Sequence, residues 1–238
     1  MSLDDLLRLL WVRWPWWLSG ALAGLWLAPL ARIISRTVLQ GAQANLIEWQ
    51  GPGGGLEQPI PLSRRIWAPL LNACLWVGAT SPASHQAFWP TLLWAGVASS
   101  LVLLALTDWD TTLLPDWVVL PLGLAGLFSS YAGGGSRGLF VSAASAVVIF
   151  GLLAGLAWGF RRINGRSGIG SGDLKLLAAL AAWWGVVDVL YIMMLASVVT
   201  VVWNLIWRRF KGLSPQAEWP FGPSIVISAL VWRLSHPV

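Results

Sequence analysis

The chain has 238 residues and a formal net charge of +5, with 57% hydrophobic and only 11% charged residues. Soluble domains carry about 25% charged residues, so this composition excludes a water-soluble globular fold and indicates an all-α polytopic membrane protein in contact with the lipid bilayer. The basic residues lie at the ends of apolar runs, where they act as topology signals, and the positive charge therefore does not indicate a nucleic-acid partner.

Residues 1–34 are expected to form a short amphipathic lead-in helix followed by a first membrane span. The span covers about residues 15–34. It contains Gly20 and Gly24, and small residues at this spacing let two helices approach each other closely. We interpret these glycines as helix-packing residues.

Residues 35–65 are predicted to be a Gly-rich cytoplasmic loop, because the run at 51–55 breaks any regular element. Residues 66–238 are predicted to be the helical membrane core. Its expected helical segments are residues 66–79, 88–106, 117–131, 139–160, 173–184, 189–207 and 224–234. Together with the first span, they give about eight (seven to eight) transmembrane or membrane-embedded helices, since 66–79 is short for a bilayer crossing.

Glycines mark two of the boundaries within this core. The run at 133–135 predicts a turn between two spans, and Gly185 is expected to end the helical segment at 173–184.

The distribution of basic residues predicts the orientation of the spans. If Asp108 lies on the cytoplasmic side, most of the 15 Lys and Arg residues fall on that side as well, which agrees with the positive-inside rule. The same threading places Asp110, Asp116 and Asp173 at the cytoplasmic border. The acidic residues therefore converge on one face.

Acidic residues lie where an apolar segment meets a polar loop in two places, with three in residues 107–116 and one in residues 168–177. A carboxylate is costly to hold ionised inside a bilayer, so such residues are functional candidates. Peptide hydrolysis by two aspartates needs one ionised carboxylate, which takes a proton from water, and one protonated carboxylate, which donates to the carbonyl oxygen. Asp108 ends one apolar helix and Asp173 begins another, so the two could face each other.

The glycines before Asp173 also have a physical use. Gly170 and Gly172 lack a Cβ atom, so the backbone could turn sharply there and approach a substrate strand closely. Their N–H groups lie where a helix begins, which favours binding of a carbonyl or carboxylate. With one cysteine and two distant histidines, the chain offers no paired-cysteine or histidine-based metal site.

Three motifs, in this order, resemble those of the type IV prepilin leader peptidases, which are intramembrane GxGD aspartyl proteases with helical, multi-span folds. They are residues 108–116 (DWDTTLLPD), 170–176 (GSGDLKL) and 220–223 (PFGP). The first catalytic aspartate of the family lies seven residues before the proline of the LPD motif, and the second is the aspartate of GxGD. The resemblance therefore implies Asp108 and Asp173 as the catalytic pair.

The resemblance implies an endopeptidase that removes the basic leader peptide from type IV prepilins or pseudopilins. Cleavage would follow a glycine at the cytoplasmic border of a bacterial inner membrane, and no metal would be required. The family's substrates enter with a hydrophobic N-terminal helix. Whether they serve a pilus, a secretion pseudopilus or a DNA-uptake apparatus stays open.

Other charged residues near the motifs are supporting candidates. Asp116 has an alternative interpretation as a helix cap, and Asp110 either tunes Asp108 or is simply solvated. Lys175 either holds Asp173 ionised, contacts substrate, or snorkels to the membrane surface.

The N-terminal part departs from the family. Many members have a four-cysteine metal-binding insert between the first two spans, where this chain has the Gly-rich residues 35–65. Many members also methylate the new N-terminus with S-adenosylmethionine, an activity associated with the N-terminal portion. N-methylation, and S-adenosylmethionine as its cofactor, are therefore left open here.

Three alternatives compete with this interpretation. A presenilin-like protease would have a Tyr-Asp motif, but neither Tyr131 nor Tyr191 precedes an aspartate. A transporter or channel would place its acidic residues in the middle of spans rather than at their ends. In a non-catalytic assembly component, the acidic residues would only pair with Arg161, Arg162 or Lys175.

Overall fold

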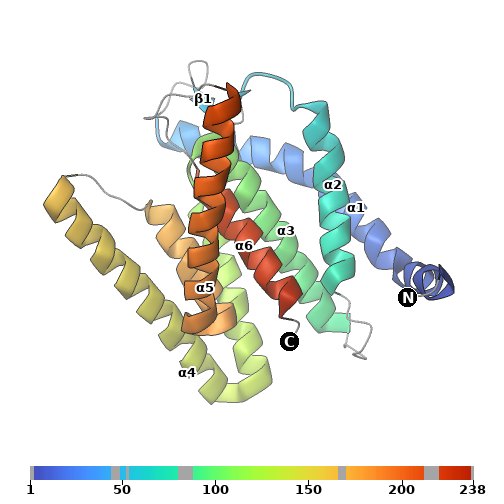
Figure 1. The fold of residues 1–238 in the computed structure, drawn as a ribbon. Helices are drawn as coiled ribbons and strands as arrows, with labels where there is room; N and C mark the ends of the chain where they lie inside the picture. Colours follow the sequence, from blue (N-terminus) through green and yellow to red (C-terminus); the bar gives the residue numbers. More distant parts are fainter. Residues whose placement is uncertain are drawn as a thin grey trace. The chain divides into compact units, whose positions relative to one another are not determined.

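The computed structural model describes residues 3–43, 49–51, 54–79, 88–165, 170–211 and 220–236. The described chain is almost entirely helical, with one short hairpin of two antiparallel strands (Figure 1). The helices are α1 (Leu3–Gly41), α2 (Leu62–Ala79), α3 (Phe88–Thr111), α4 (Asp116–Asn164), α5 (Ser171–Lys211) and α6 (Gly222–Ser235). The strands are β1 (Gln50–Gly51) and β2 (Gly54–Gly55).

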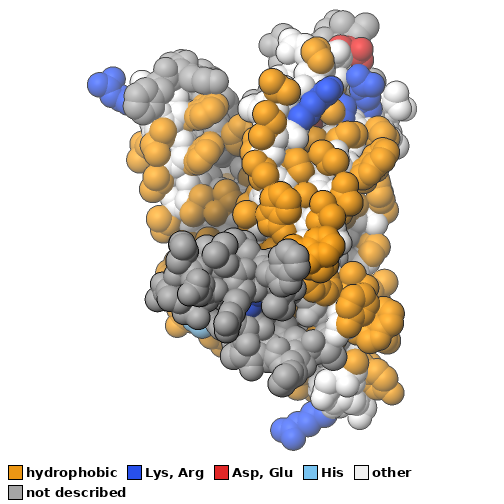
Figure 2. All heavy atoms as spheres, turned by 90° about the vertical axis from the view of Figure 1, so that its right-hand side faces the viewer, with side chains coloured by type: hydrophobic (Ala, Val, Ile, Leu, Met, Phe, Trp, Pro, Cys, Tyr) orange, Lys and Arg blue, Asp and Glu red, His pale blue; other side chains and the backbone are white. Residues whose placement is uncertain are grey.

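Four of the described helices are long and apolar enough to cross a membrane: Arg13–Gly41 within α1, Phe88–Thr111, Asp116–Asn164, and Ser171–Trp207 within α5. Large apolar side chains are exposed along them, such as Trp26 on α1 and Phe128 on α4. Figure 2 shows hydrophobic side chains over most of the described surface of one face. Such a surface is stable in lipid and not in water, so the expected polytopic helical membrane protein is confirmed.

Two glycines break the long helices. Gly135 (φ 60°, ψ −148°) divides α4, and Gly185 (φ 84°, ψ 178°) divides α5, so each of these helices consists of two arms. The expected turn at 133–135 and the expected helix end at Gly185 are therefore confirmed. With the arms counted separately, the described residues form eight helical segments in the expected order. How many of the segments cross a bilayer stays a prediction.

The chain divides into two compact units: unit 1 is Met1–Asp110 with Arg233–Val238, and unit 2 is Thr111–Trp232. These boundaries do not coincide with the predicted divisions at residues 34 and 65. The predicted divisions describe membrane topology, which the compact units do not test, so they stay a prediction.

In unit 1, α1 packs closely against α2 through two glycines. A Cβ on Gly24 would lie 2.5 Å from the Cα of Pro69, and a Cβ on Gly20 would lie 2.9 Å from the Cα of Ala73. The packing role predicted for both glycines is therefore confirmed. The contact also contains a buried polar side chain, because Asn72 donates to the carbonyl oxygen of Gly20 at 2.8 Å.

Helix α1 is longer than the predicted first span, since it continues beyond residue 34 to Gly41. Leu39 and Ser35 are fully or almost fully buried in this extension, so tertiary packing keeps a polar-looking segment helical. The connection between α1 and α2 is accordingly shorter than the predicted loop at 35–65.

In unit 2, the first arm of α5 packs against both arms of α4 (Figure 1). Its core is formed by Leu176, Leu177 and Leu180, all almost fully buried. The indole of Trp183 donates to the carbonyl oxygen of Leu122, in the first arm of α4. The hydroxyl of Ser142, in the second arm, donates to the carbonyl oxygen of Ala182. This arm of α5 begins with the GxGD segment, so the core of unit 2 fixes the helix that bears Asp173.

Candidate active site

Asp108 lies in the last turn of α3 and is almost fully buried, with 3% of its surface exposed. Leu101, Leu104 and Leu106 of this helix are all buried. The buried side chains then continue into Thr107 and Asp108, so the first predicted catalytic carboxylate is held by a packed helix end rather than by a loop.

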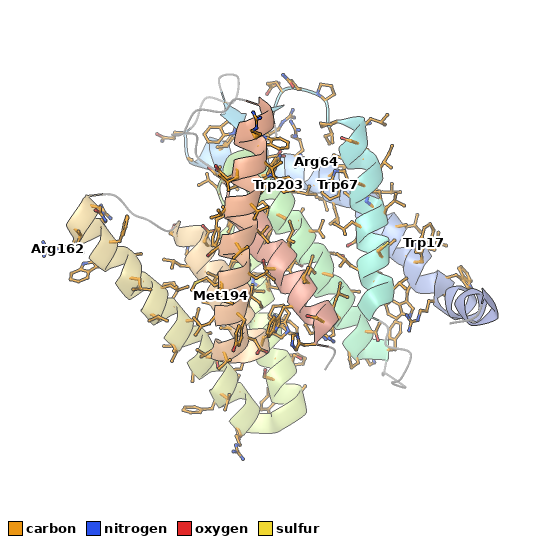
Figure 3. The ribbon with its side chains drawn as sticks, viewed as in Figure 1. Trp17, Arg64, Trp67, Arg162, Met194 and Trp203 are labelled. Carbon is orange, nitrogen blue, oxygen red and sulfur yellow. The ribbon has the colours of Figure 1, made fainter. Side chains whose placement is uncertain are left out.

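Asp110 is fully buried, and the interpretation that it is solvated is wrong. Nη1 of Arg64, near the start of α2, lies 2.9 Å from both carboxylate oxygens (Arg64 is labelled in Figure 3). Arg32 of α1 is a second cation nearby, with Nε 3.9 Å from Oδ2. A carboxylate with this little solvent is stable only when it is paired. Asp110 is thus an ion-pair partner that joins α1, α2 and α3.

The LPD turn connects α3 to α4 in unit 2. The backbone N–H of Leu113 donates to the hydroxyl oxygen of Thr111, and Thr112 has a positive φ of 55°. Pro115 is the N-cap residue of α4, and no side chain caps it. The helix-cap interpretation of Asp116 is therefore wrong, because Asp116 is the first residue of the helix itself.

The carboxylate of Asp116 instead binds Lys175. Nζ of Lys175 lies 2.7 Å from each of the two oxygens, and both side chains are partly exposed. None of the three predicted roles for Lys175 includes an ion pair with Asp116. The assembly alternative did pair the acidic residues with Lys175, and this one contact agrees with it.

The GxGD segment begins α5 and lies against the LPD turn. A Cβ on Gly172 would lie 2.9 Å from the Cβ of Leu114, so the two motifs meet at a position where only glycine fits without displacement. The N–H of Leu174 donates to the carbonyl oxygen of Gly170, which places Asp173 in the first turn of the helix. An anionic side chain is favoured there by the helix dipole. Gly168 and Ile169, which begin the predicted segment at 168–177, lie outside the described residues.

The structure thus brings the predicted site residues together in two groups. Asp108 and Asp110 lie in unit 1, and Asp116, Gly170, Gly172, Asp173 and Lys175 lie in unit 2. The approach of Asp108 to Asp173 stays a prediction. Among the described residues, no group of three or more His, Cys, Asp and Glu side chains could hold a metal ion.

Sequence reasoning missed the arginine partners of Asp110. Arg64 closed the predicted loop and Arg32 ended the predicted first span, so both were counted only as topology signals. Both are buried in the structure. No local pattern distinguishes them from the exposed Arg36 and Arg65, because their burial depends on contacts across 46 and 78 positions of the chain.

Fold and site together define a helical membrane protein with two aspartates at helix ends, one buried and one in the first turn of an apolar helix. Residues 95–205 match the model of the type IV leader peptidase family, and the family resemblance seen in the motifs is therefore confirmed. The matched range includes the LPD and GxGD motifs with both predicted catalytic aspartates. No solved structure gave a significant match.

Three relatives, each named prepilin leader peptidase/N-methyltransferase, support the same family. The protein of Aeromonas hydrophila is 35% identical over 201 residues, which cover 79% of this chain and 65% of the relative. The protein of Pseudomonas aeruginosa is 36% identical over 148 residues (59% and 48%), and that of Neisseria gonorrhoeae is 32% identical over 169 residues (63% and 55%). The chain therefore spans between about half and just under two thirds of the length of these relatives.

Proposed function

We propose that this protein is a membrane-embedded aspartyl endopeptidase that removes the leader peptide from type IV prepilins or pseudopilins. The observation that supports it best is the pairing of the family match over 95–205 with an aspartate at a helix end in each of its two acidic motifs. Cleavage after a glycine, at the cytoplasmic border of a bacterial inner membrane, is part of the proposal.

Asp108 and Asp173 would share the chemistry. One carboxylate takes a proton from water as the water oxygen forms a bond to the scissile carbonyl carbon, and the other donates its proton to the carbonyl oxygen. When the carbonyl re-forms, the C–N bond breaks and the nitrogen takes a proton from the aspartates. Two like charges in close contact favour this division into one ionised and one protonated carboxylate.

The proposed substrates have a hydrophobic N-terminal helix behind the leader. The apolar outer surfaces of α4 and α5 would let such a helix remain in lipid while its leader reaches the polar border. Basic side chains near this border, such as Arg161 and Arg162 at the end of α4, agree with a cytoplasmic orientation (Arg162 is labelled in Figure 3).

The names of the relatives also include an N-methyltransferase activity. N-methylation with S-adenosylmethionine as methyl donor is tested separately below, and we derive no methylation step from the described residues.

The test is cleavage of a prepilin-type substrate by the purified protein in lipid, with wild type compared with Asp108→Asn and Asp173→Asn. We expect each substitution to abolish cleavage while thermal unfolding stays near that of wild type. Asp188→Asn is the matched control, because it removes a carboxylate of the same helix α5 outside the three motifs.

If both variants still cut, or if wild type never cuts, the peptidase proposal fails. Loss of cleavage in Asp188→Asn as well would indicate a general effect of removing a carboxylate from the membrane helices. Inclusion of S-adenosylmethionine in the wild-type reaction, followed by mass spectrometry of the product, tests methylation separately.

A further inference from the structure

The segment after the β-hairpin is held against α1 through its backbone carbonyls. Nη1 of Arg32 donates to the carbonyl oxygens of Gly55 at 3.1 Å and Gln58 at 3.2 Å. Nη2 of Arg36 donates to the carbonyl oxygen of Leu56 at 2.9 Å. The side chain of Leu56 is fully buried, so this loop does not extend into solvent.

The same Arg32 lies beside Asp110. Its Nε is 3.9 Å from Oδ2 of Asp110, whose two oxygens both accept from Arg64 at 2.9 Å. Arg64 also donates to the carbonyl oxygen of Leu106, and the indole of Trp49 donates to the carbonyl oxygen of Asp110 itself. We call these four residues the Asp110 cluster: Asp110, Arg64, Arg32 and Trp49. The cluster joins α1, α2 and α3 to the loop.

The charges in this cluster depend on one another. In the ion pairs of the described residues, the buried Arg32 and Arg64 have the same carboxylate as partner, so its loss would remove the counter-ion of two guanidinium groups of like charge. A buried charge without a partner is strongly unfavourable, and the side chains would move toward water. Arg32 would then release the carbonyls of Gly55 and Gln58.

Asp110 is poorly placed to exchange protons with a substrate. Both of its oxygens are already occupied by Arg64, and the side chain has no exposed surface. It lies two residues after Asp108, on the same final turn of α3. Its geometry suits a residue that fixes the helix end rather than one that reacts.

We infer that Asp110 is a positioning residue that acts through Arg64 and Arg32. It fixes the end of α3 that bears Asp108, and it keeps the loop at 54–58 docked onto α1. The docking follows from contacts within unit 1 alone. Only its consequence for cleavage rests on the proposed peptidase function.

Cysteine labelling of the purified protein tests the docking without any activity assay. In a Cys74→Ser background, which removes the single native cysteine, Leu56→Cys is treated with a maleimide. We expect slow labelling with the Asp110 cluster intact, and labelling faster by about tenfold or more with Asp110→Asn or Arg32→Gln added. Glu57→Cys, at an exposed neighbouring position, should label rapidly in every background.

Asp116→Asn is the matched control for charge loss, because its carboxylate binds Lys175 in unit 2 and should leave the labelling of Leu56→Cys unchanged. Labelling rates that differ by less than about twofold between the intact and the Asp110→Asn cluster would overturn the docking. If Asp110→Asn does not fold, Arg32→Gln decides, since it removes the loop contacts and leaves the Arg64–Asp110 pair in place.

Kinetics test the positioning. We expect Asp110→Asn and Arg64→Gln each to lower kcat by about tenfold to a hundredfold with little change in KM, since small displacements of a reacting group cost this much. The double variant should lose no more than either single variant, and Asp110→Glu should recover part of kcat.

A complete loss of cleavage in Asp110→Asn with nearly normal turnover in Arg64→Gln would overturn the positioning role and indicate a reacting carboxylate. If wild type does not cleave, the peptidase proposal fails, and the labelling experiment still decides whether Asp110 docks the loop.

Discussion

Nζ of Lys175 lies 2.7 Å from both carboxylate oxygens of Asp116, so an ion pair joins the first turn of α5 to the first residue of α4. The two side chains are 36% and 53% exposed. Ion pairs this accessible to solvent contribute only about 0–1 kcal/mol to the free energy of unfolding, because water already stabilises the separated charges.

Lys175→Met should therefore lower the free energy of unfolding by less than about 1 kcal/mol. Asp116→Asn should have the same small effect, and the double variant should lose no more than either single variant. Denaturant unfolding in detergent at low and high salt measures this, and the difference from wild type should shrink as salt screens the pair. A loss of several kcal/mol would show that Lys175 has a buried partner as well.

Gly172→Ala should destabilise unit 2 by about 1–3 kcal/mol, which is the usual cost of inserting a methyl group into a packed contact. The added Cβ would lie 2.9 Å from the Cβ of Leu114, which cannot rotate away. Gly159→Ala is the control, since no atom lies within 4 Å of its added Cβ. Thermal unfolding that is equal for the two variants would contradict the close approach of the LPD and GxGD motifs.

Gly185→Ala should lower the free energy of unfolding by about 1–3 kcal/mol for a different reason. The backbone angles of Gly185 lie in a region of φ/ψ space that is essentially restricted to glycine. Space is not limiting here, because the nearest atom to an added Cβ is Oγ of Ser145 at 4.0 Å. Gly151→Ala, within the second arm of α4, has open space and helical backbone and serves as control. A stability equal to that of the control would mean that α5 does not bend at residue 185.

Asn72→Ala should lower the free energy of unfolding by about 1–3 kcal/mol, because it removes two hydrogen bonds of a fully buried side chain, each contributing about 0.5–1.5 kcal/mol. Its amide donates to the carbonyl oxygen of Gly20, and its carbonyl oxygen accepts from the hydroxyl of Ser99 at 2.9 Å. Ser100→Ala is the matched control, since that exposed hydroxyl bonds only within its own helix, to Gly96. Unfolding of both variants is compared in the same detergent, and equal stability would exclude a contribution from the Asn72 contacts.

Local sequence signals predicted much of this fold. Long apolar runs located the helices, and the glycines at 133–135 and 185 located the breaks within α4 and α5. These features depend on hydropathy and on backbone freedom, which short stretches of sequence determine. The motifs likewise located Asp108 and Asp173 at helix ends.

Contacts between distant residues could not be predicted in the same way. The partner of Asp110 lies 46 residues earlier, and that of Asp116 lies 59 residues later, with no periodic pattern to connect them. The extension of α1 to Gly41 similarly depends on the burial of Leu39 in unit 1. Each of these outcomes is decided by tertiary packing, which composition and local propensity do not contain.

The bend in α5 has a consequence for how the protein is made. A helical arm that stops at a break leaves its last carbonyls without donors from its own helix, and lipid supplies none. The hydroxyls of Ser142 and Ser130, both on α4, donate to the carbonyl oxygen of Ala182 just before the bend. Because α4 precedes α5 in the chain, these donors leave the ribosome before the carbonyl that needs them. Both donors are thus already in the chain when their shared acceptor is synthesised.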